Sequence, residues 1–150
     1  ERIVLVALGG IDSELPLESW PRIDGLVWLF PVEVHLQRDD LVEMRNLSLP
    51  FIDVLASADA VLTKPGYGTY AEAVCNGVPV LTLARPDWPE TPGLNGWAQE
   101  HGCLRVITKE AFQSGRFADV LESMWRQPLP EPPVAEGIPK AVDVLAGYLA

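Results

Sequence analysis

Short apolar runs, separated by segments with helical spacing, dominate the hydrophobic pattern of this chain. Several of these runs are apolar at consecutive positions rather than at alternate ones, and the first ends at a pair of glycines. Consecutive apolar positions are typical of parallel strands, because helices cover both faces of a parallel sheet. The runs predict six strands: residues 3–8, 25–30, 41–47, 60–63, 78–84 and 103–107.

The segments between the strands place apolar residues at the spacing of helices. Pro50 suits the first turn of one predicted helix, and Gly77 and Gly102 follow two others as C-caps. The predicted helices are residues 50–58, 69–76, 95–101, 111–125 (whole, or divided at Gly115) and 140–150. This alternation predicts an α/β fold: a three-layer, doubly wound domain around a mostly parallel six-stranded sheet.

A length of 150 residues, 48% of them apolar, fits one domain with its own core. We therefore expect a single domain over residues 1–150. Prolines cluster in residues 128–139, which predicts a stiff extended connector. The predicted helix over residues 140–150 either docks back on the domain or reaches a neighbouring domain.

The charge balance narrows the class of partner. With 21 acidic and 11 basic residues the formal net charge is -10, which argues against DNA, RNA or an anionic membrane surface. No run of about 18 consecutive apolar residues exists, so the sequence predicts no transmembrane helix. The apolar run at residues 3–8 is short and lacks a cleavage site, so it does not predict a signal peptide.

Cysteines and histidines are scarce. Cys75 and Cys103 are too few for a disulfide scaffold or a zinc site, and we interpret both as reduced core thiols of a cytoplasmic protein. His35 and His101 belong to no metal or triad spacing, and we interpret them as ordinary surface or cap residues. The sequence thus predicts no metal and no cofactor, and it places any catalytic base outside the chain.

The strongest candidate for chemistry is the segment Thr63-Lys-Pro-Gly-Tyr-Gly-Thr-Tyr-Ala-Glu72, which leaves a strand and opens a helix. Free backbone N–H groups at a helix start, with the positive end of its dipole, form a seat for phosphate. Gly66 and Gly68 would allow close approach of a ligand, and the Thr69 hydroxyl is placed to bind or to cap. The spacing matches neither a Walker loop nor the dinucleotide fingerprint, so a tight structural turn is the alternative.

Gly9 and Gly10 form a second glycine turn, after the first predicted strand. Ligands of open α/β sheets bind beyond the carboxyl ends of the strands, so two such turns can face one ligand. An ordinary loop is the alternative for this pair. Glu72 follows Thr69 by three residues, and it is either half of a capping box or a carboxylate that accepts two ribose hydroxyls.

The segment Arg85-Pro-Asp-Trp-Pro-Glu90 follows the fifth predicted strand and combines both signs of charge with an aromatic ring. Such a loop at the ligand edge suits a sugar or an acceptor. A solvated loop stiffened by proline is the alternative.

Residues 58–81, from Ala58-Asp-Ala-Val to Val78-Pro-Val-Leu81, resemble the donor-site signature of GT-B glycosyltransferases. The type they resemble is family 28, which includes the N-acetylglucosaminyltransferase of peptidoglycan synthesis. The shared pattern is a strand, a glycine-rich turn, Thr, Glu-Ala, a glycine, Pro and a following apolar strand. The resemblance covers residues 48–102 well and the rest loosely, as a Rossmann-like C-terminal half domain.

The resemblance implies a role for each residue that matches the family pattern. Two glycine turns hold the donor diphosphate, one acid takes the ribose hydroxyls, and an apolar pair packs on the base, where the backbone of Ile52 reads its edge. The residues are Gly9, Gly10, Gly66, Gly68 and Thr69 for the diphosphate, Glu72 for the ribose, and Phe51 and Ile52 for the base.

In the family, the loop after the fifth strand meets the sugar, often through an Asp/Glu-Gln pair. Here Arg85, Asp87, Glu90 and Asn95 occupy that region, and this departure leaves the identity of the sugar open.

A GT-B enzyme has two such domains, and the acceptor site and usually the base belong to the N-terminal one. We expect that domain to be absent from this chain. The resemblance then implies the donor-binding half of an inverting glycosyltransferase that uses a nucleotide diphosphate sugar, with UDP favoured. It also implies no catalytic residue here and no activity of the chain alone. The absence of an Asp-x-Asp pair agrees with the prediction of no metal.

Two alternatives remain open at this point. One is a non-catalytic or regulatory nucleotide-sugar binding module, as in the glycosyltransferase-like segments fused to sugar kinases. The other is a nucleotide-sugar epimerase, which needs acids and a histidine in the cleft and is disfavoured by the two isolated histidines.

Overall fold

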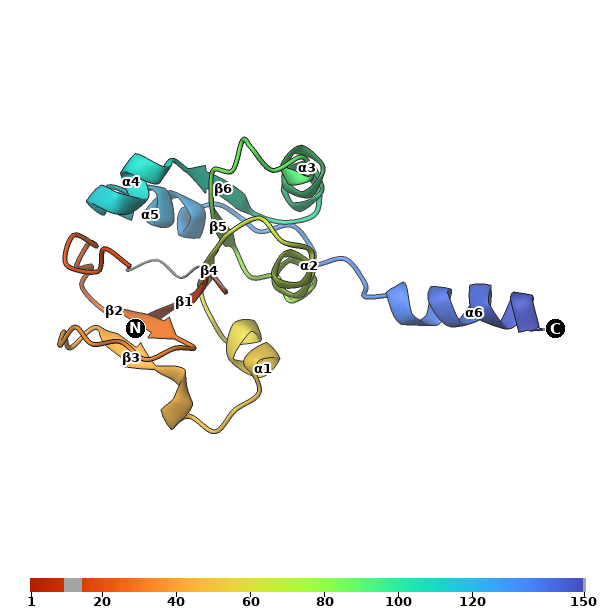
Figure 1. The fold of residues 1–150 in the computed structure, drawn as a ribbon, viewed down its shortest axis with the longest axis horizontal. Helices are drawn as coiled ribbons and strands as arrows, with labels where there is room; N and C mark the ends of the chain where they lie inside the picture. The colour runs from red at the N-terminus through yellow and green to blue at the C-terminus, as the bar shows by residue number, and fades with distance from the viewer. Residues whose placement is uncertain (10–14, 150) are drawn as a thin grey trace.

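Six strands form one sheet in the order β3-β2-β1-β4-β5-β6, and every neighbouring pair runs parallel (Figure 1). The structure is a computed structural model of the chain, and it describes residues 1–9 and 15–149. The strands are β1 (Arg2–Ala7), β2 (Leu26–Phe30), β3 (Leu41–Glu43), β4 (Ala60–Thr63), β5 (Val80–Leu83) and β6 (Leu104–Ile107). The helices are α1 (Phe51–Ala56), α2 (Tyr67–Cys75), α3 (Thr91–His101), α4 (Lys109–Ser114), α5 (Ala118–Arg126) and α6 (Gly137–Leu149), with a 3-10 turn, η1 (Met44–Asn46).

The side chains of the central strands fill two cores, one on each face of the sheet, because successive residues of a strand point to opposite sides. Leu5, Val61 and Val80 pack in the core that α1, α2 and α3 cover. Leu62 and Leu81 pack in the core that α4 and α5 cover. Figure 1 shows the two helical layers on opposite sides of the sheet. The predicted doubly wound α/β fold is confirmed.

Two helices begin earlier than the sequence pattern predicted. α2 starts at Tyr67 rather than at Thr69, since Gly66 is extended at φ -171° and the chain turns into the helix directly after it. α3 starts at Thr91 rather than at Asn95, and it carries a proline in its first turn, where no intrahelical N–H is needed.

Two other predicted elements are shorter or divided. β3 ends at Glu43 and η1 follows it, so the predicted strand over residues 41–47 is wrong in its second half. The predicted helix over residues 111–125 is divided, because Gly115 takes the left-handed conformation (φ 70°) and ends α4 as its C-cap.

The connector and the last helix lead away from the sheet (Figure 1). Pro132 passes over the end of α2, where its Cγ lies 3.0 Å from the position that a Cβ on Gly77 would take. α6 begins at Gly137, three residues before its predicted start, and its described side chains are all exposed, including Ile138 at 81% and Tyr148 at 85%. Of the two alternatives, docking back on the domain is therefore not the arrangement in the structure.

An irregular segment, rather than a helix, completes the layer over β1 and β2. Among the described residues between these strands, residues 15–20 form turns, and Trp20 is almost fully buried. The Trp20 ring lies between 5.0 and 6.1 Å from four other buried rings, which are Trp28, Phe30, Phe112 and Phe117. This aromatic cluster joins the segment to α4 and to the start of α5.

A backbone contact at Gly115 fixes the same segment. A Cβ on Gly115 would lie 1.8 Å from the carbonyl oxygen of Ser19, so the two backbones touch. The Ser19 hydroxyl also donates to the carbonyl oxygen of Gln113 at 2.6 Å. Gly115 is thus required twice, for its positive φ and for the missing side chain.

A buried arginine anchors the segment from its other side. The side chain of Arg38 is 4% exposed, and it donates to the carbonyl oxygens of Leu17 at 2.5 Å and Trp20 at 3.2 Å. Its remaining donors reach Asp40, at 2.9 Å from Nε to Oδ1 and 2.5 Å from Nη2 to Oδ2. These hydrogen bonds hold the pKa of the Asp40 carboxyl below its ordinary value.

Both cysteines are free thiols. Cys103 is buried in the core beneath α4 and α5, where burial raises the pKa of its thiol. Cys75, at the end of α2, is only half-buried, so the interpretation of both as core thiols holds for Cys103 and not fully for Cys75.

We predict that Gly115→Ala lowers the free energy of unfolding by at least about 2 kcal/mol, because the methyl group meets the Ser19 carbonyl and the positive φ is strained. Gly96→Ala is the matched control, since Gly96 lies in α3 with nothing within 4 Å of its Cβ position. This change should raise stability by about 0.5–1 kcal/mol. Urea unfolding of the three proteins measures both effects, and equal stabilities would contradict the prediction.

We also predict that Asp40→Asn lowers the free energy of unfolding by about 1–2 kcal/mol at neutral pH. Because the folded pKa lies below the ordinary value of 3.8, the pair stabilises the fold above that pH and loses this contribution as the pH falls through the folded pKa. The difference between parent and variant should therefore be constant from about pH 5 to 8 and shrink below about pH 4.

The neighbouring Asp39→Asn serves as the control, because the Asp39 side chain is 92% exposed and its ion pair with Arg22 spans 3.4 Å. Such surface pairs contribute little, so this variant should follow the parent at every pH. If the Asp40 variant is less stable than the parent by the same free energy of unfolding at every pH, the charge of the Asp40 carboxylate does not contribute to the stability of the fold.

Candidate functional site

The turns after β1 and β4 meet at one point on the carboxyl edge of the sheet. These strands are neighbours, with Ala7 paired to Thr63, and the strand order reverses direction between them. The Thr63 hydroxyl donates to the carbonyl oxygen of Ala7 at 2.8 Å, and the Lys64 ammonium donates to the carbonyl oxygen of Gly9 at 2.5 Å. A crevice at such a switch point is where open α/β sheets bind ligands.

The start of α2 presents backbone amides at this point. The first of its amides with an intrahelical partner is that of Tyr70, which donates to the carbonyl oxygen of Gly66 at 3.2 Å. The amides of Tyr67, Gly68 and Thr69 precede it and have no acceptor within the helix. No side chain caps this end of the helix among the described residues. Three N–H groups and the helix dipole are thus available to an anion.

The glycines in this turn are not required by the fold. Neither Gly66 nor Gly68 is among the glycines with positive φ, and φ -171° at Gly66 is an extended conformation that any residue adopts. A Cβ on Gly68 would have nothing within 4 Å, and one on Gly66 would meet only the Lys64 carbonyl oxygen at 3.9 Å. Space beside the free amides is therefore left open, which weakens the alternative of a purely structural turn.

Thr69 and Glu72 do not form a capping box. With Gly66 as the N-cap, Thr69 is the third residue of α2, so of the two roles left open for its hydroxyl, capping is not the one in the structure. Glu72 lies one turn further along, half-buried, and its carboxylate has no hydrogen-bond or ion-pair partner among the described residues. The carboxylate is therefore free for a ligand.

α1 places the two predicted base-binding residues beside α2. Phe51 and Ile52 are its first two residues. The first amide that donates to the carbonyl oxygen of Pro50 is that of Asp53, so the amides of Phe51 and Ile52 do not make this hydrogen bond. Phe51 packs partly into the core beneath α1, α2 and α3, while Ile52 is 39% exposed. Ile52 thus offers a free amide and an apolar side chain at the surface.

The loop between β5 and α3 is held by its own contacts. The Arg85 guanidinium lies over the Trp88 ring at 5.1 Å, and the Trp88 indole donates to the Glu90 carboxylate at 3.3 Å. Asp87 is exposed. Arg85 and Glu90 therefore both contact one aromatic ring at the carboxyl edge of β5, and Asp87 lies in the same loop.

Asn95 lies outside this loop, in the second turn of α3. Its Oδ1 accepts a hydrogen bond from the hydroxyl of Tyr70 at 2.9 Å. Tyr70 is fully buried, and burial raises its pKa to about 12, so the phenol stays a donor. This bond joins α2 to α3 and fixes the orientation of the Asn95 side chain, which leaves its amide nitrogen to donate.

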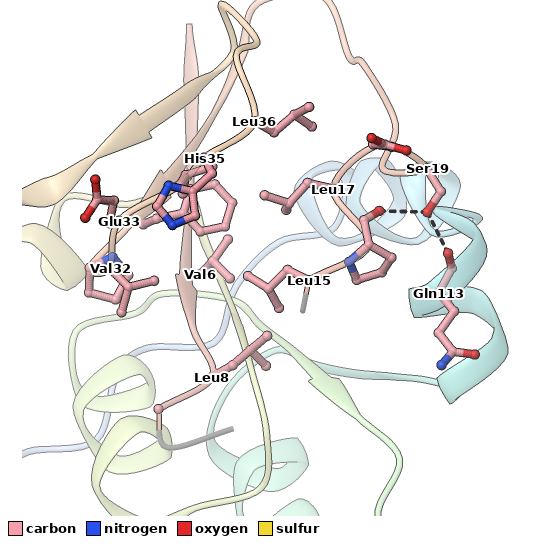
Figure 2. Close-up of a pocket in the computed structure, with 16 residues that line it drawn as sticks. Val6, Leu8, Leu15, Leu17, Ser19, Val32, Glu33, His35, Leu36 and Gln113 are labelled. Atoms are coloured by element: carbon pink, nitrogen blue, oxygen red, sulfur yellow. Dashed lines mark hydrogen bonds between the residues drawn. The ribbon is translucent and has the colours of Figure 1, made fainter. Parts of the chain in front are cut away.

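The sequence analysis missed a cavity of about 860 Å3 on the other face of the sheet (Figure 2). It lies beyond β1 and β2, between residues 15–19 on one side and residues 31–36 on the other. Of the predicted site residues that the structure describes, Gly9 alone lines it, and His35, interpreted as an ordinary residue, lines it as well. The sequence signal was the alternation of Val32, Val34 and Leu36 with polar residues directly after a strand.

Three further observations bear on the site. Gly10 lies outside the described residues, so its predicted role stays a prediction. Within residues 1–9 and 15–149, no group of three or more His, Cys, Asp or Glu could hold a metal ion. Among the same residues, no helix has the length and apolar character needed to cross a membrane.

Comparisons with known proteins identify the fold. No protein-family model matches the chain. An uncharacterized glycosyltransferase of Methanopyrus kandleri is 23% identical over 158 residues, covering 98% of this chain and 45% of that protein. Among solved structures, the calicheamicin glycosyltransferase CalG4 superposes with a TM-score of 0.65 at 20% identity, over 99% of this chain and 43% of that one. The glycotransferase of kitacinnamycin gives a TM-score of 0.64 at 20% identity, over 85% and 36%.

The chain spans less than half the length of each of these proteins. The matches do not single out family 28 among glycosyltransferases. The chain has the fold of the C-terminal domain of GT-B glycosyltransferases.

Proposed function

We propose that this chain is the donor-binding half of a glycosyltransferase, which takes a sugar from a nucleotide diphosphate sugar, with UDP favoured, to an acceptor. The observation that carries the proposal is the turn at residues 66–69. Its glycines are not required by the fold, and they leave open the space beside three amides that have no acceptor within the helix. The similar proteins named above are glycosyltransferases, which favours this function over the regulatory module and the epimerase.

The diphosphate would lie between the two turns at the switch point. The amides of Tyr67, Gly68 and Thr69 would donate to it from one side, and the turn at Gly9 and Gly10 would face it from the other. A chain with a net charge of -10 repels a diphosphate at long range, so local donors must supply the attraction. Lys64 is the nearest candidate cation, because its ammonium already lies on the Gly9 carbonyl between the turns.

The nucleoside would extend from the diphosphate toward α1. Glu72, half-buried and without a partner among the described residues, would accept the two ribose hydroxyls. Phe51 and Ile52 would pack on the base, and the free amide of Ile52 would read its edge. Both helices cover the same face of the sheet.

The sugar would point toward the loop before α3. Arg85, Asp87 and Glu90 would meet its hydroxyls, and Asn95 would offer the amide nitrogen that Tyr70 leaves free. Arg85, in the loop after β5, would be a second cation for the leaving group.

The chemical contribution of this half would be electrostatic. As the bond between the sugar and the diphosphate breaks, negative charge grows on the leaving phosphate, and preorganised N–H groups stabilise it without reorganisation. The acceptor site and the base would come from the N-terminal domain, so we propose that the chain alone has no transferase activity.

Free thiols at Cys75 and Cys103 support a cytoplasmic location.

Calorimetric titration of the chain with UDP, GDP and dTDP tests the nucleotide directly, and UDP should bind tightest. Glu72→Ala should weaken UDP binding by about 1–3 kcal/mol, because the ribose hydroxyls lose a charged acceptor. Thr69→Ala should weaken it in the same direction. Glu100→Ala, which removes an exposed acid on α3, is the control. Equal affinity of the Glu72 and Glu100 variants would show that Glu72 does not touch the ribose.

Gly68→Ala separates binding from folding. A Cβ at this position meets nothing in the protein and replaces a glycine inside a helix, so the variant should be more stable by about 0.5–1 kcal/mol. The same methyl group would enter the proposed phosphate seat, so UDP affinity should fall by about tenfold or more. Gly96→Ala provides the matched change in α3 and should leave UDP affinity unaltered. If both variants bind UDP like the parent, no phosphate approaches residue 68.

A further inference from the structure

A buried tyrosine joins the helix that carries the phosphate turn to the helix that follows β5. Tyr70 of α2 is fully buried, and its hydroxyl donates to Oδ1 of Asn95 in α3 at 2.9 Å. The two helices pack side by side, and both start at the carboxyl edge of the sheet (Figure 1). At 1.5 Å per residue, the bond lies only about 5–6 Å along each helix from its first residue.

The tyrosine supplies the proton of this hydrogen bond. Burial raises the pKa of Tyr70 to about 12, so the phenol keeps its proton at neutral pH. A buried O–H group needs an acceptor, and within residues 1–9 and 15–149 the phenol makes one hydrogen bond, to Oδ1 of Asn95. If the amide were turned round, its NH2 group would face the phenol and the buried O–H would lose this acceptor. Tyr70 therefore determines which end of the Asn95 amide faces the phenol.

The nitrogen end of the Asn95 amide is left for a ligand. Asn95 is half-buried, and no group in the described part of the chain accepts a hydrogen bond from its Nδ2. An amide nitrogen donates to a hydroxyl or carbonyl oxygen, and it offers nothing to a group that can only donate. The acceptors of this region belong instead to the loop before α3, in the carboxylates of Asp87 and Glu90.

We propose that Tyr70 is a positioning residue for the donor sugar, which holds Asn95 so that its amide nitrogen donates to an uncharged oxygen of the sugar. That oxygen belongs to a hydroxyl group or to the carbonyl of an acetamido group. The proposal rests on the proposed function, because it is a bound nucleotide sugar that brings a sugar to α3. Tyr70 itself touches no ligand, since it is fully buried, and it acts through Asn95.

The same hydrogen bond could serve only to pack α2 against α3, and the two roles have different consequences. The start of α2 carries the amides proposed to bind the diphosphate, so a loosened α2 would weaken UDP and UDP-sugars alike. A misplaced Asn95 amide would weaken the UDP-sugars and leave UDP unaffected. The affinity for a UDP-sugar relative to that for UDP therefore separates positioning from packing.

Calorimetric titration with UDP, UDP-glucose, UDP-galactose and UDP-N-acetylglucosamine tests the proposal. Tyr70→Phe should keep UDP affinity within about twofold and weaken at least one of the three UDP-sugars by about fivefold or more. Thr82→Val is the control, because it removes the other hydroxyl beside the phenol, which is fully buried and has no hydrogen-bond partner among the described residues. This control should leave all four affinities unaltered. A Tyr70 variant that loses UDP and the UDP-sugars equally, or loses neither, would overturn the proposal.

Asn95→Asp tests the same role without changing the buried tyrosine. The new carboxylate still accepts from Tyr70, so the contact between α2 and α3 is kept, but the N–H donor is lost. The affinity for the UDP-sugar that Tyr70→Phe weakens should fall by about fivefold or more relative to UDP, as it should in Asn95→Ala. An Asn95→Asp variant with the relative affinities of the parent would assign the bond to packing alone and overturn the proposal.

The titration of the parent distinguishes this proposal from the proposed function. A parent that binds neither UDP nor any UDP-sugar overturns the donor site, and with it the role of Tyr70. A parent that binds UDP, and loses it in Glu72→Ala, keeps the donor site. In that case, relative affinities that do not respond to Tyr70→Phe overturn the positioning role alone.

Discussion

The parallel pairing of β1 with β4 is the contact on which the candidate site depends. These strands are distant in sequence, and their pairing at Ala7 and Thr63 aligns the two carboxyl ends. The hydroxyl of Thr63 and the ammonium of Lys64 then tie the two turns together through backbone carbonyls. Both bonds satisfy polar groups at the rim of the sheet, so the turns are held at one separation. The amides of α2, the β1 turn and the cavity beside it all take their places from this junction.

The sequence predicted the parts of the fold that depend on burial. Consecutive apolar residues in β1 and β4 mark strands covered on both faces, and both faces are covered. Helix starts were less accurate, because a start depends on one local turn rather than on a repeated pattern. Gly66 shows the reason, since its extended conformation lets the helix begin two residues before the first polar residue that could cap it.

Only the part of the candidate site that lies within one continuous segment of the sequence could be predicted. The turn at residues 66–69 is local, and its amides lie where the sequence pattern placed them. The partner of Asn95 could not be foreseen, because Tyr70 lies on another helix and the two meet only after both pack on the sheet. The cavity could not be foreseen either, because its walls come from residues 15–19 and 31–36. Tertiary contacts such as those of Ser19 with Gly115 and of Arg38 with Leu17 bring these segments together.

The exposed helix α6 has a thermodynamic consequence of its own. Ile138, Val142, Leu145 and Tyr148 recur at intervals of four and three residues, so they form a single stripe along one side of it. A helix of 13 residues whose described side chains are all exposed is marginal in water, since its nucleation is unfavourable. Any surface that covers this stripe therefore has to order the segment as well as contact it. Coupled ordering of this kind makes association entropically costly and gives it a large negative heat-capacity change.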